Sequence, residues 1–221
     1  MANSSDLARF NMIQQQIRPW GVLDDRVLEV MGALEREQFV PDAYRALAYA
    51  DLEIPNANGS LMLAPKLVGH LLQALAVAPG QRVLEIGTGS GYVAACLSRL
   101  GARVISLELD AAQAELARSR LAALKCDWVE VREGDGLAGA VSGGPFDAIA
   151  VKGSLPTEDA LPQLCEQLNI GGRLFCILGT APAMECVRIT RAGRDSYQRE
   201  SLFEFTVPPL RNAPEAAGFV F

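Results

Sequence analysis

The sequence is poor in metal-binding residues and in basic surface. It contains one histidine, His70, and five cysteines, no two of which form a Cys-x-x-Cys pair. Zinc sites need clustered Cys and His ligands, so we expect no metal site and instead free thiols in a reducing compartment. The formal net charge is −6, and no run of Lys and Arg offsets it, so nucleic-acid binding is not expected.

Long apolar segments are also lacking, although half of the residues are hydrophobic. The stretch MANSSDLARF is polar and has no apolar core of a signal peptide, and no later run is long enough to span a bilayer. We therefore expect a cytoplasmic protein that makes no use of a membrane. The 221 residues fit one domain, or a core domain with a smaller appendage.

Residues 1–64 contain helical and loop patterns but no parallel-strand pattern. Expected helices cover, in chain order, 5–18 up to Pro19, a segment capped by Asp24 or Asp25 and closed by Pro41, and 42–50. Residues 54–64 are rich in Pro, Asn and Gly, which indicates a loop. We interpret 1–64 as a helical amino-terminal appendage followed by that loop.

From Pro65 onward, helical segments alternate with short apolar runs that are typical of buried strands. The expected strands are RVLEIG, ARVISLELD, WVEVREGDG, FDAIAVKG and GGRLFCILG. The alternation predicts an α/β fold with a doubly wound, mostly parallel, Rossmann-like sheet. Two later runs, CVRITRAG and YQRESLFEFTV, bring the expected strands to seven and predict an antiparallel carboxyl-terminal hairpin. Residues 65–221 are interpreted as one compact domain with an irregular surface tail after Pro209.

A glycine-rich turn separates the first of these strands from a helix. Its residues are Gly87, Thr88, Gly89, Ser90 and Gly91. Glycines allow positive φ angles and close approach of a ligand to the backbone, and open parallel sheets bind ligands beyond the carboxyl ends of their strands. Tyr92 replaces the third glycine of a dinucleotide fingerprint. Glu85 would repel a pyrophosphate, but it suits a ligand that carries an ammonium and a sulfonium.

Carboxylates also follow the next two strands. Glu108, with Leu109 beside it, ends the second strand and can accept both hydrogens of a ribose diol. Asp135 and Gly136 end the third strand, where a carboxylate and backbone amides can bind adenine. The three strand ends are in the order that an adenosine with a methionine tail requires, so we predict S-adenosyl-L-methionine as the cofactor. An NAD site, and a plain turn with solvated acids, are the alternatives.

The segments VLEIGTGSGY, SLELD and EGDG resemble those of class I methyltransferases. R-x-x-F-V-P at Arg36–Pro41 and A-Y-x-D at Ala48–Asp51 are similar to the leading segments of protein-L-isoaspartate O-methyltransferases. The resemblance covers most of the chain. It implies the seven-stranded class I fold, S-adenosyl-L-methionine as the cofactor, and carboxyl O-methylation of isoaspartyl residues in proteins or peptides as a repair reaction.

The sequence departs from that family where the methyl acceptor is expected to bind. The family's loop G-Q-T-I-S-Q-P corresponds to Gly59–Pro65, in which the Ser position holds Leu63 and the Thr position holds Leu61. The family's strand end V-T-A-A-A is here V-K-G-S-L, at Val151–Leu155. The expected acceptor-binding residues are Ser60, Met62, Leu63 and Lys152. Lys152 is either an anchor for an anionic acceptor or a solvated strand-end charge.

The sequence identifies no catalytic residue. A carboxylate acceptor is already a nucleophile and needs only alignment with the methyl group, whereas an alcohol, amine or thiol would need a base. His70 falls on the expected helix after Pro65, where it is interpreted as a helix-face residue. Three hypotheses follow: an isoaspartyl methyltransferase, a methyltransferase of the same scaffold with another acceptor such as a small molecule, and a cofactor-binding protein without transferase activity. Oligomeric state is not assigned.

Overall fold

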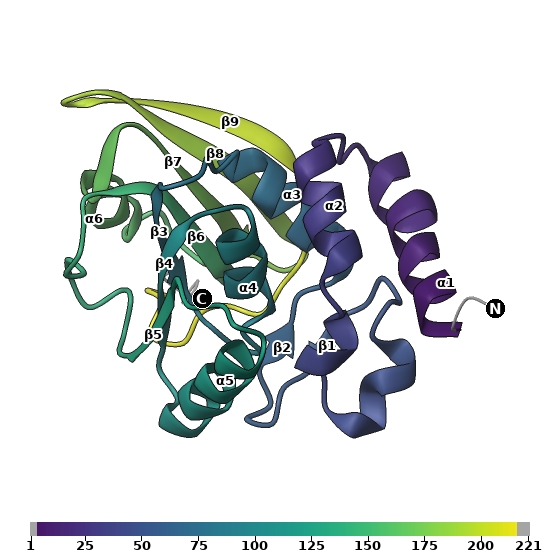
Figure 1. Ribbon diagram of the computed structural model, residues 1–221. Helices are drawn as coiled ribbons and strands as arrows, with labels where there is room; N and C mark the ends of the chain where they lie inside the picture. Colours follow the sequence, from purple (N-terminus) through teal and green to yellow (C-terminus); the bar gives the residue numbers. More distant parts are fainter. Residues whose placement is uncertain (1–3, 216–221) are drawn as a thin grey trace, which may run out of the picture.

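A seven-stranded sheet forms the centre of the computed structural model, which describes residues 4–215 (Figure 1). The strand order is β5-β4-β3-β6-β7-β8-β9. The first five strands in this order are parallel to one another, whereas β8 is antiparallel to β7 and β9 is antiparallel to β8. The strands are β3 Arg82–Ile86, β4 Arg103–Glu108, β5 Val129–Glu133, β6 Phe146–Leu155, β7 Leu168–Thr180, β8 Ala183–Gly193 and β9 Ser196–Glu204. The predicted doubly wound sheet and its antiparallel hairpin are confirmed.

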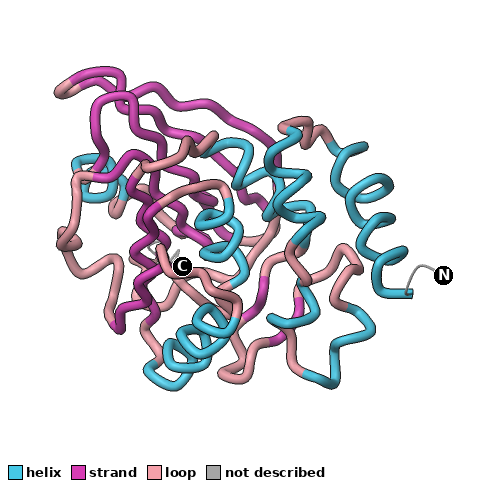
Figure 2. Tube along the Cα trace, viewed as in Figure 1, coloured by secondary structure: helices cyan, strands magenta, loops and turns pink. Residues whose placement is uncertain are grey.

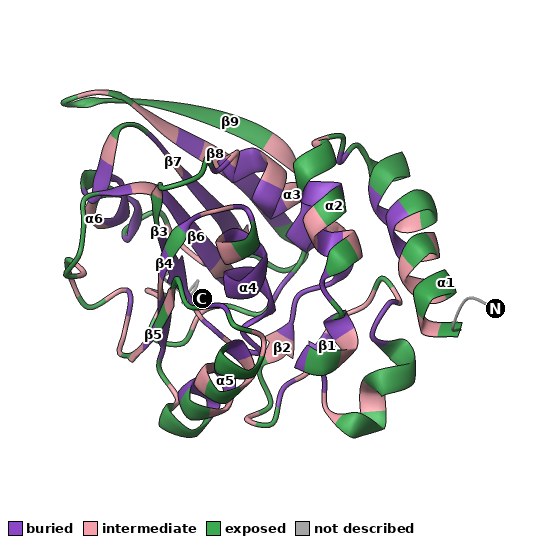
Figure 3. Ribbon diagram, viewed as in Figure 1, coloured by how far each residue is buried: buried purple, intermediate pink, exposed green. Residues whose placement is uncertain are grey.

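Helices cover both faces of this sheet. They are α3 Pro65–Leu75, α4 Tyr92–Arg99, α5 Ala111–Ala123 and α6 Leu161–Glu166. Successive strand residues point to opposite faces, so Val83 packs in the hydrophobic cluster of α3 and α4 while Leu84 packs in that of α6. Figure 3 shows buried residues along the strands and on the sheet-facing sides of the helices. Because both faces of the sheet are buried, side chains on either face are mostly apolar, and the parallel strands appear in the sequence as continuous apolar runs.

The amino-terminal segment packs on the α3–α4 side. Helix α1, Ser4–Asn11, continues as a π-helix over Met12–Ile17 and a 3-10 turn over Arg18–Trp20. Helicity therefore passes through Pro19, the predicted end, and the chain turns at Gly21 with φ of 91°. Helix α2, Asp25–Ala33, begins at the predicted cap, because the Asp24 carboxylate accepts from the Arg26 amide at 3.0 Å. Helix α2 ends at Ala33, before the predicted end at Pro41, and a 3-10 turn over Arg36–Phe39 follows it. A second 3-10 turn, Asp42–Leu47, takes the place of the helix expected over 42–50.

The segment expected to be a loop contains a small hairpin instead (Figure 2). Strand β1, Ile54–Pro55, pairs antiparallel with β2, Leu61–Met62. A hydrogen bond from the Asn56 amide to the Ser60 carbonyl, at 2.7 Å, closes the turn between them. Gly59 in this turn has a φ angle of 80°. Polar turn residues hid two strands that are only two residues long.

A buried arginine joins this hairpin to the rest of the molecule. Arg36 is fully buried, and its guanidinium donates to the carbonyl oxygens of Ala48 and Leu63, each at 2.8 Å. The guanidinium also lies 5.0 Å from the centre of the Tyr92 ring on α4. Burial lowers the pKa of Arg36. The backbone of Leu63 is thus held against the helix that follows the glycine turn.

All five cysteines are buried and unpaired. Burial raises the pKa of the Cys96 thiol to about 12 and that of Cys165 to about 11. Within residues 4–215, no group of three or more His, Cys, Asp or Glu side chains is arranged to hold a metal ion. Across the same residues, none of the helices combines the length and the hydropathy needed to cross a membrane.

Candidate functional site

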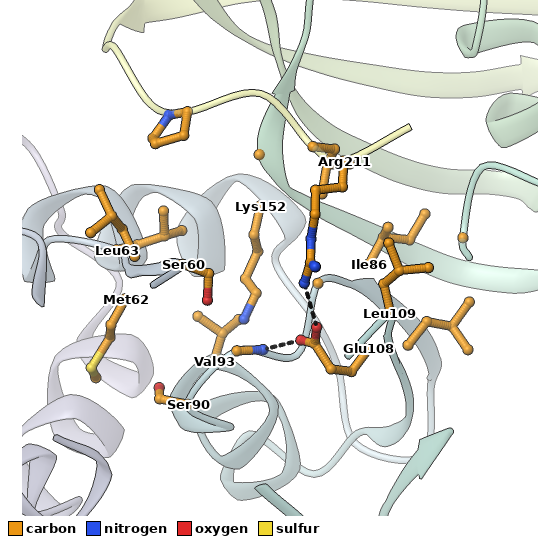
Figure 4. Close-up of a pocket in the computed structure, with 18 of the residues that line it drawn as sticks. Ser60, Met62, Leu63, Ile86, Ser90, Val93, Glu108, Leu109, Lys152 and Arg211 are labelled. Atoms are coloured by element: carbon orange, nitrogen blue, oxygen red, sulfur yellow. Dashed lines mark hydrogen bonds and ion pairs between the residues drawn. The ribbon is translucent and has the colours of Figure 1, made fainter. Parts of the chain in front are cut away.

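A cavity of about 390 Å³ lies beyond the carboxyl ends of β3, β4, β5 and β6. The glycine turn, the β1–β2 hairpin and residues 208–211 line it. Figure 4 shows Lys152 between Ser60, Met62 and Leu63 on one side and Glu108 and Leu109 on the other. The predicted residues that line the cavity are Ser60, Met62, Leu63, Gly87, Gly89, Ser90, Glu108, Leu109, Asp135, Gly136 and Lys152. Glu85, Thr88 and Gly91 lie behind it.

The glycine turn has a backbone that only glycine adopts readily. Gly87, Gly89 and Gly91 have φ angles of 90°, 55° and 87°. The amides of Gly87 and Thr88 donate to the Leu107 carbonyl at 2.9 and 3.0 Å, which fixes the turn against β4. Gly91 is the N-cap of α4 and does not line the cavity. Its place in the predicted site is therefore structural.

The Glu108 carboxylate is nearly buried but reaches the cavity. The Gly89 amide donates to Oε2 at 2.8 Å, and the Asp110 amide donates to Oε1 at 3.2 Å. An Arg211 guanidinium nitrogen lies 3.8 Å from Oε1 (Figure 4). Backbone donors thus fix the orientation of Glu108, and its cavity side faces a solvent-exposed arginine.

The Asp135 carboxylate is held in a similar way. Its Oδ1 accepts from the Leu137 amide at 2.8 Å, and its Oδ2 accepts from the Asn212 side chain at 2.9 Å. A Cβ atom on Gly136 would lie 2.6 Å from a methyl carbon of Ile86, so this position requires glycine. The second and third strand ends therefore present a carboxylate each, as predicted.

Glu85 and Lys152 form a buried ion pair, which changes the interpretation of both. Glu85 is fully buried, and its Oε1 lies 2.8 Å from Lys152 Nζ. Lys152 also donates to the Thr88 carbonyl at 2.8 Å, while Ser106 donates to Glu85 and shares a 2.6 Å hydrogen bond with Thr88. This pairing and the 12% exposure of the Lys152 side chain contradict the solvated strand-end charge, whereas an anchor for an anionic acceptor stays a prediction, because Lys152 lines the cavity. Glu85 likewise holds the underside of the glycine turn and does not face the cavity.

The carboxyl-terminal segment closes one side of the cavity. The Ser154 amide donates to the Pro208 carbonyl and the Leu210 amide donates to the Ser154 carbonyl, each at 3.0 Å. Arg211 and Asn212 then reach Glu108 and Asp135. Of the expected surface tail, Arg211 is thus part of the cavity wall and Asn212 contacts Asp135 behind it. Residues 216–221 lie outside the described part of the chain.

Replacing Gly153 by alanine is expected to displace this segment, because the added Cβ would lie 2.8 Å from both the amide nitrogen and Cγ of Leu210. If the segment is displaced, trypsin should cleave after Arg211 faster than in the unmodified chain. If the segment stays in place, overpacking should lower the free energy of unfolding by about 1–3 kcal/mol. Gly134→Ala is the matched control, since a Cβ there meets no atom within 4 Å. Equal cleavage and stability of both variants would contradict the assignment.

The hairpin side of the cavity is mostly apolar. Met62 and Leu63 are buried, whereas Ser60 is exposed and its hydroxyl donates to Asn58 at 2.7 Å and accepts from Asn56 at 3.0 Å. His70 lies on α3 with its ring 4.4 Å from that of Phe203, and it does not line the cavity. This position agrees with the helix-face interpretation of His70.

Sequence reasoning missed several residues of the site, including four with polar or charged side chains. Gln113 on α5 is buried and donates to the Gly89 carbonyl at 2.7 Å, and Glu53 lines the cavity beside the hairpin. Arg211 and Asn212 complete the set. A carboxylate flanked by Leu52 and Ile54 was a readable signal for Glu53. The positions of Gln113, Arg211 and Asn212 in the site depend on contacts between segments that are distant in sequence, and no local sequence pattern indicated them.

The fold and the glycine turn with its two strand-end carboxylates define a class I methyltransferase. A family model described as protein-L-isoaspartate(D-aspartate) O-methyltransferase matches residues 8–210. The chain belongs to this family, which confirms the resemblance seen in its leading segments.

Individual relatives agree with the family model. A protein-L-isoaspartate O-methyltransferase of Methylorubrum populi is 40% identical over 97% of this chain and 100% of its own length. Protein-L-isoaspartate O-methyltransferase 1 of Rhodopseudomonas palustris strain HaA2 is 41% identical over 95% of this chain and 85% of its own. A Plasmodium falciparum structure assigned to the same enzyme, solved with S-adenosyl-L-homocysteine, aligns with a TM-score of 0.79 at 20% identity, covering 95% of this chain and 99% of its own. That likeness supports the fold.

Proposed function

We propose that this chain transfers the methyl group of S-adenosyl-L-methionine to the side-chain carboxylate of isoaspartyl residues in proteins or peptides. The observation that carries the proposal is the family match over residues 8–210, which includes both the cofactor-side strand ends and the β1–β2 hairpin. The relatives' names point to the same reaction. They favour neither of the alternatives, another acceptor or a protein without transferase activity.

The residues present fit this cofactor. We assign the ribose diol to Glu108, adenine to Asp135 and the Gly136 amide, with Leu109 packed beside the nucleoside, and the methionine arm to the turn at Gly87, Gly89 and Ser90. The support is that these residues line one cavity at adjoining strand ends, and that Gly87 and Gly89, with positive φ angles, leave the backbone of the turn uncovered by side chains of their own. Glu85 and Thr88 contribute indirectly, by fixing the turn through Lys152 and Ser106.

The bound cofactor supplies an electrophilic methyl group on a sulfonium. Methyl transfer is an in-line displacement in which the acceptor oxygen forms the new O–C bond as the C–S bond breaks. The work of the chain is to hold the acceptor oxygen and methyl carbon in line and to exclude water. Ser60, Met62 and Leu63 on the hairpin are assigned to acceptor binding, and Lys152 contributes by holding the turn. An ionised carboxylate requires no general base.

The remaining assignments belong to the same proposal. Residues 65–221 form the methyltransferase domain, and residues 1–64 supply the appendage and the acceptor-facing hairpin. Hydrophobic residues of both parts share one cluster, which supports their acting as a unit. The enzyme acts in the cytoplasm on protein substrates and binds neither nucleic acid nor membranes.

A labelled-methyl assay tests this function directly. The enzyme is incubated with labelled cofactor and either an isoaspartyl peptide or the same peptide with a normal aspartyl residue. We expect base-labile label on the isoaspartyl peptide alone. Calorimetry with S-adenosyl-L-homocysteine checks cofactor binding in the same preparation. If the product cofactor binds but neither peptide is labelled, the repair function is rejected and the fold assignment is not.

A further inference from the structure

A carboxyl group lies on the acceptor side of the cavity, directly before β1. Ile54 pairs with Met62 across the hairpin, and Glu53 and Leu63 are the residues that flank this last pair. Both Glu53 and Leu63 line the cavity. The chain thus has a carboxyl group beside the position where its family's loop carries a serine hydroxyl.

One oxygen of this half-buried carboxyl group has no partner. Its Oε1 is buried and accepts no hydrogen bond within the described residues. The two cations that line the cavity are engaged elsewhere, Lys152 with Glu85 and the Thr88 carbonyl, and Arg211 with Glu108. An unpaired group of this kind is costly to keep in place, so a ligand that satisfies it is the expected explanation.

Its surroundings disfavour the charged form relative to a glutamate in water. Met62, Leu63, Val68 and Val93 line the same cavity, and burial raises the pKa of Glu53 above its ordinary value. The other titratable or charged groups that line the cavity are Tyr92, Glu108, Asp135, Lys152 and Arg211. Burial is the sole cause of the Glu53 shift, so none of these groups offsets it.

We propose that Glu53, in its protonated form, donates a hydrogen bond to the carboxylate of the methyl acceptor and so replaces the hydroxyl that Leu63 lacks. The proposal rests on the isoaspartyl function argued above. A carboxyl and a carboxylate in contact share one proton, because two adjacent negative charges disfavour ionisation of both. Binding of the acceptor carboxylate therefore favours the protonated form of Glu53.

The reaction balances with this proton in place. One acceptor oxygen accepts from Glu53, and the other attacks the methyl carbon. The O–CH₃ bond forms as the S–CH₃ bond breaks, and the bonding pair stays on sulfur. The proton remains on Glu53, now donated to the carbonyl oxygen of the methyl ester. Glu53 is thus a substrate-binding donor and not a base.

Two substitutions at Glu53 separate donor from base. Glu53→Gln keeps an N–H donor but cannot ionise, and Glu53→Ala removes the donor. Glu29→Gln is the matched control, because Glu29 is exposed on α2 and does not line the cavity. Measurements are KM and kcat for the isoaspartyl peptide across the pH range, with calorimetric affinity for S-adenosyl-L-homocysteine as the check on folding and the cofactor side.

We expect Glu53→Ala to raise peptide KM about 10- to 100-fold, the effect of one hydrogen bond to a charged group, with a smaller change in kcat. In the unmodified enzyme KM should rise with pH as Glu53 ionises, and in Glu53→Gln this rise should vanish while activity persists. Cofactor affinity should match that of Glu29→Gln throughout.

Several results would overturn the proposal. An unchanged KM in Glu53→Ala shows that Glu53 does not touch the acceptor. Loss of activity in Glu53→Gln equal to that in Glu53→Ala, with cofactor affinity intact, shows that the ionised group is needed. An unmodified enzyme that binds product cofactor but labels no isoaspartyl peptide rejects the proposed function as well, so the two failures are distinguishable.

Discussion

Glu108→Ala is expected to weaken cofactor binding by a factor of about 10²–10⁴. A carboxylate that accepts two hydrogen bonds from a ribose diol loses about 1.5–3 kcal/mol for each, and about 1.4 kcal/mol corresponds to tenfold in affinity. The loss also includes the acceptor of the Gly89 amide, whose 2.8 Å hydrogen bond links Glu108 to the glycine turn. Isothermal titration with S-adenosyl-L-homocysteine measures the effect.

The adjacent strand provides the control for this experiment. Glu133 is paired with Glu108 in the register of β4 and β5, but it is exposed and does not line the cavity. Glu133→Ala should therefore bind the cofactor as the unmodified chain does. Glu108→Gln, which keeps one carbonyl acceptor, should fall between the two. Unchanged affinity in Glu108→Ala would remove the basis for the cofactor assignment.

Lys152→Met is expected to lower the free energy of unfolding by about 3 kcal/mol. The substitution leaves the fully buried Glu85 carboxylate without its cation, and removal of one partner of a buried pair typically costs about 3–5 kcal/mol. We take the lower end because the Lys152 side chain keeps 12% exposure and Ser106 still donates to Glu85. Urea denaturation monitored by circular dichroism gives the value.

The double variant Glu85→Gln/Lys152→Met identifies the cause. With both charges removed, most of the lost stability should return, because no uncompensated charge stays buried. Cofactor affinity should remain reduced in both variants, since the hydrogen bond from Lys152 to the Thr88 carbonyl is lost in each. A double variant as unstable as Lys152→Met would show that packing of the lysine chain, and not its charge, supports the turn.

Sequence patterns predicted the parts of the fold that local rules control. Apolar runs between helical segments located β3 to β7, and the turn glycines with Glu108 and Asp135 located the cofactor-side strand ends, because strand order brings consecutive carboxyl ends to one edge. The cap at Asp24 followed from its side-chain chemistry. These features depend on neighbours that are close in sequence.

The errors share a different cause. The pairing of Lys152 with Glu85 joins residues on neighbouring strands that are far apart in the chain, and it depends on side-chain depth that spacing does not encode. Arg211 reaches Glu108 only because the segment after β9 returns to β6 at Ser154. Polar residues between Pro55 and Leu61 indicated a loop correctly but concealed the hairpin whose last pair, Ile54 and Met62, is flanked by Glu53 and Leu63.

The buried thiols make cysteine chemistry a readout of global unfolding. Alkylating reagents attack the thiolate, and burial suppresses that form at all five positions, since it also raises the pKa of Cys126, Cys176 and Cys186. Modification in the native protein must therefore wait for an opening event, so its rate measures how often the core becomes exposed. A cysteine introduced on the surface would react first and accept a fluorophore at a single site, without removal of the natural ones.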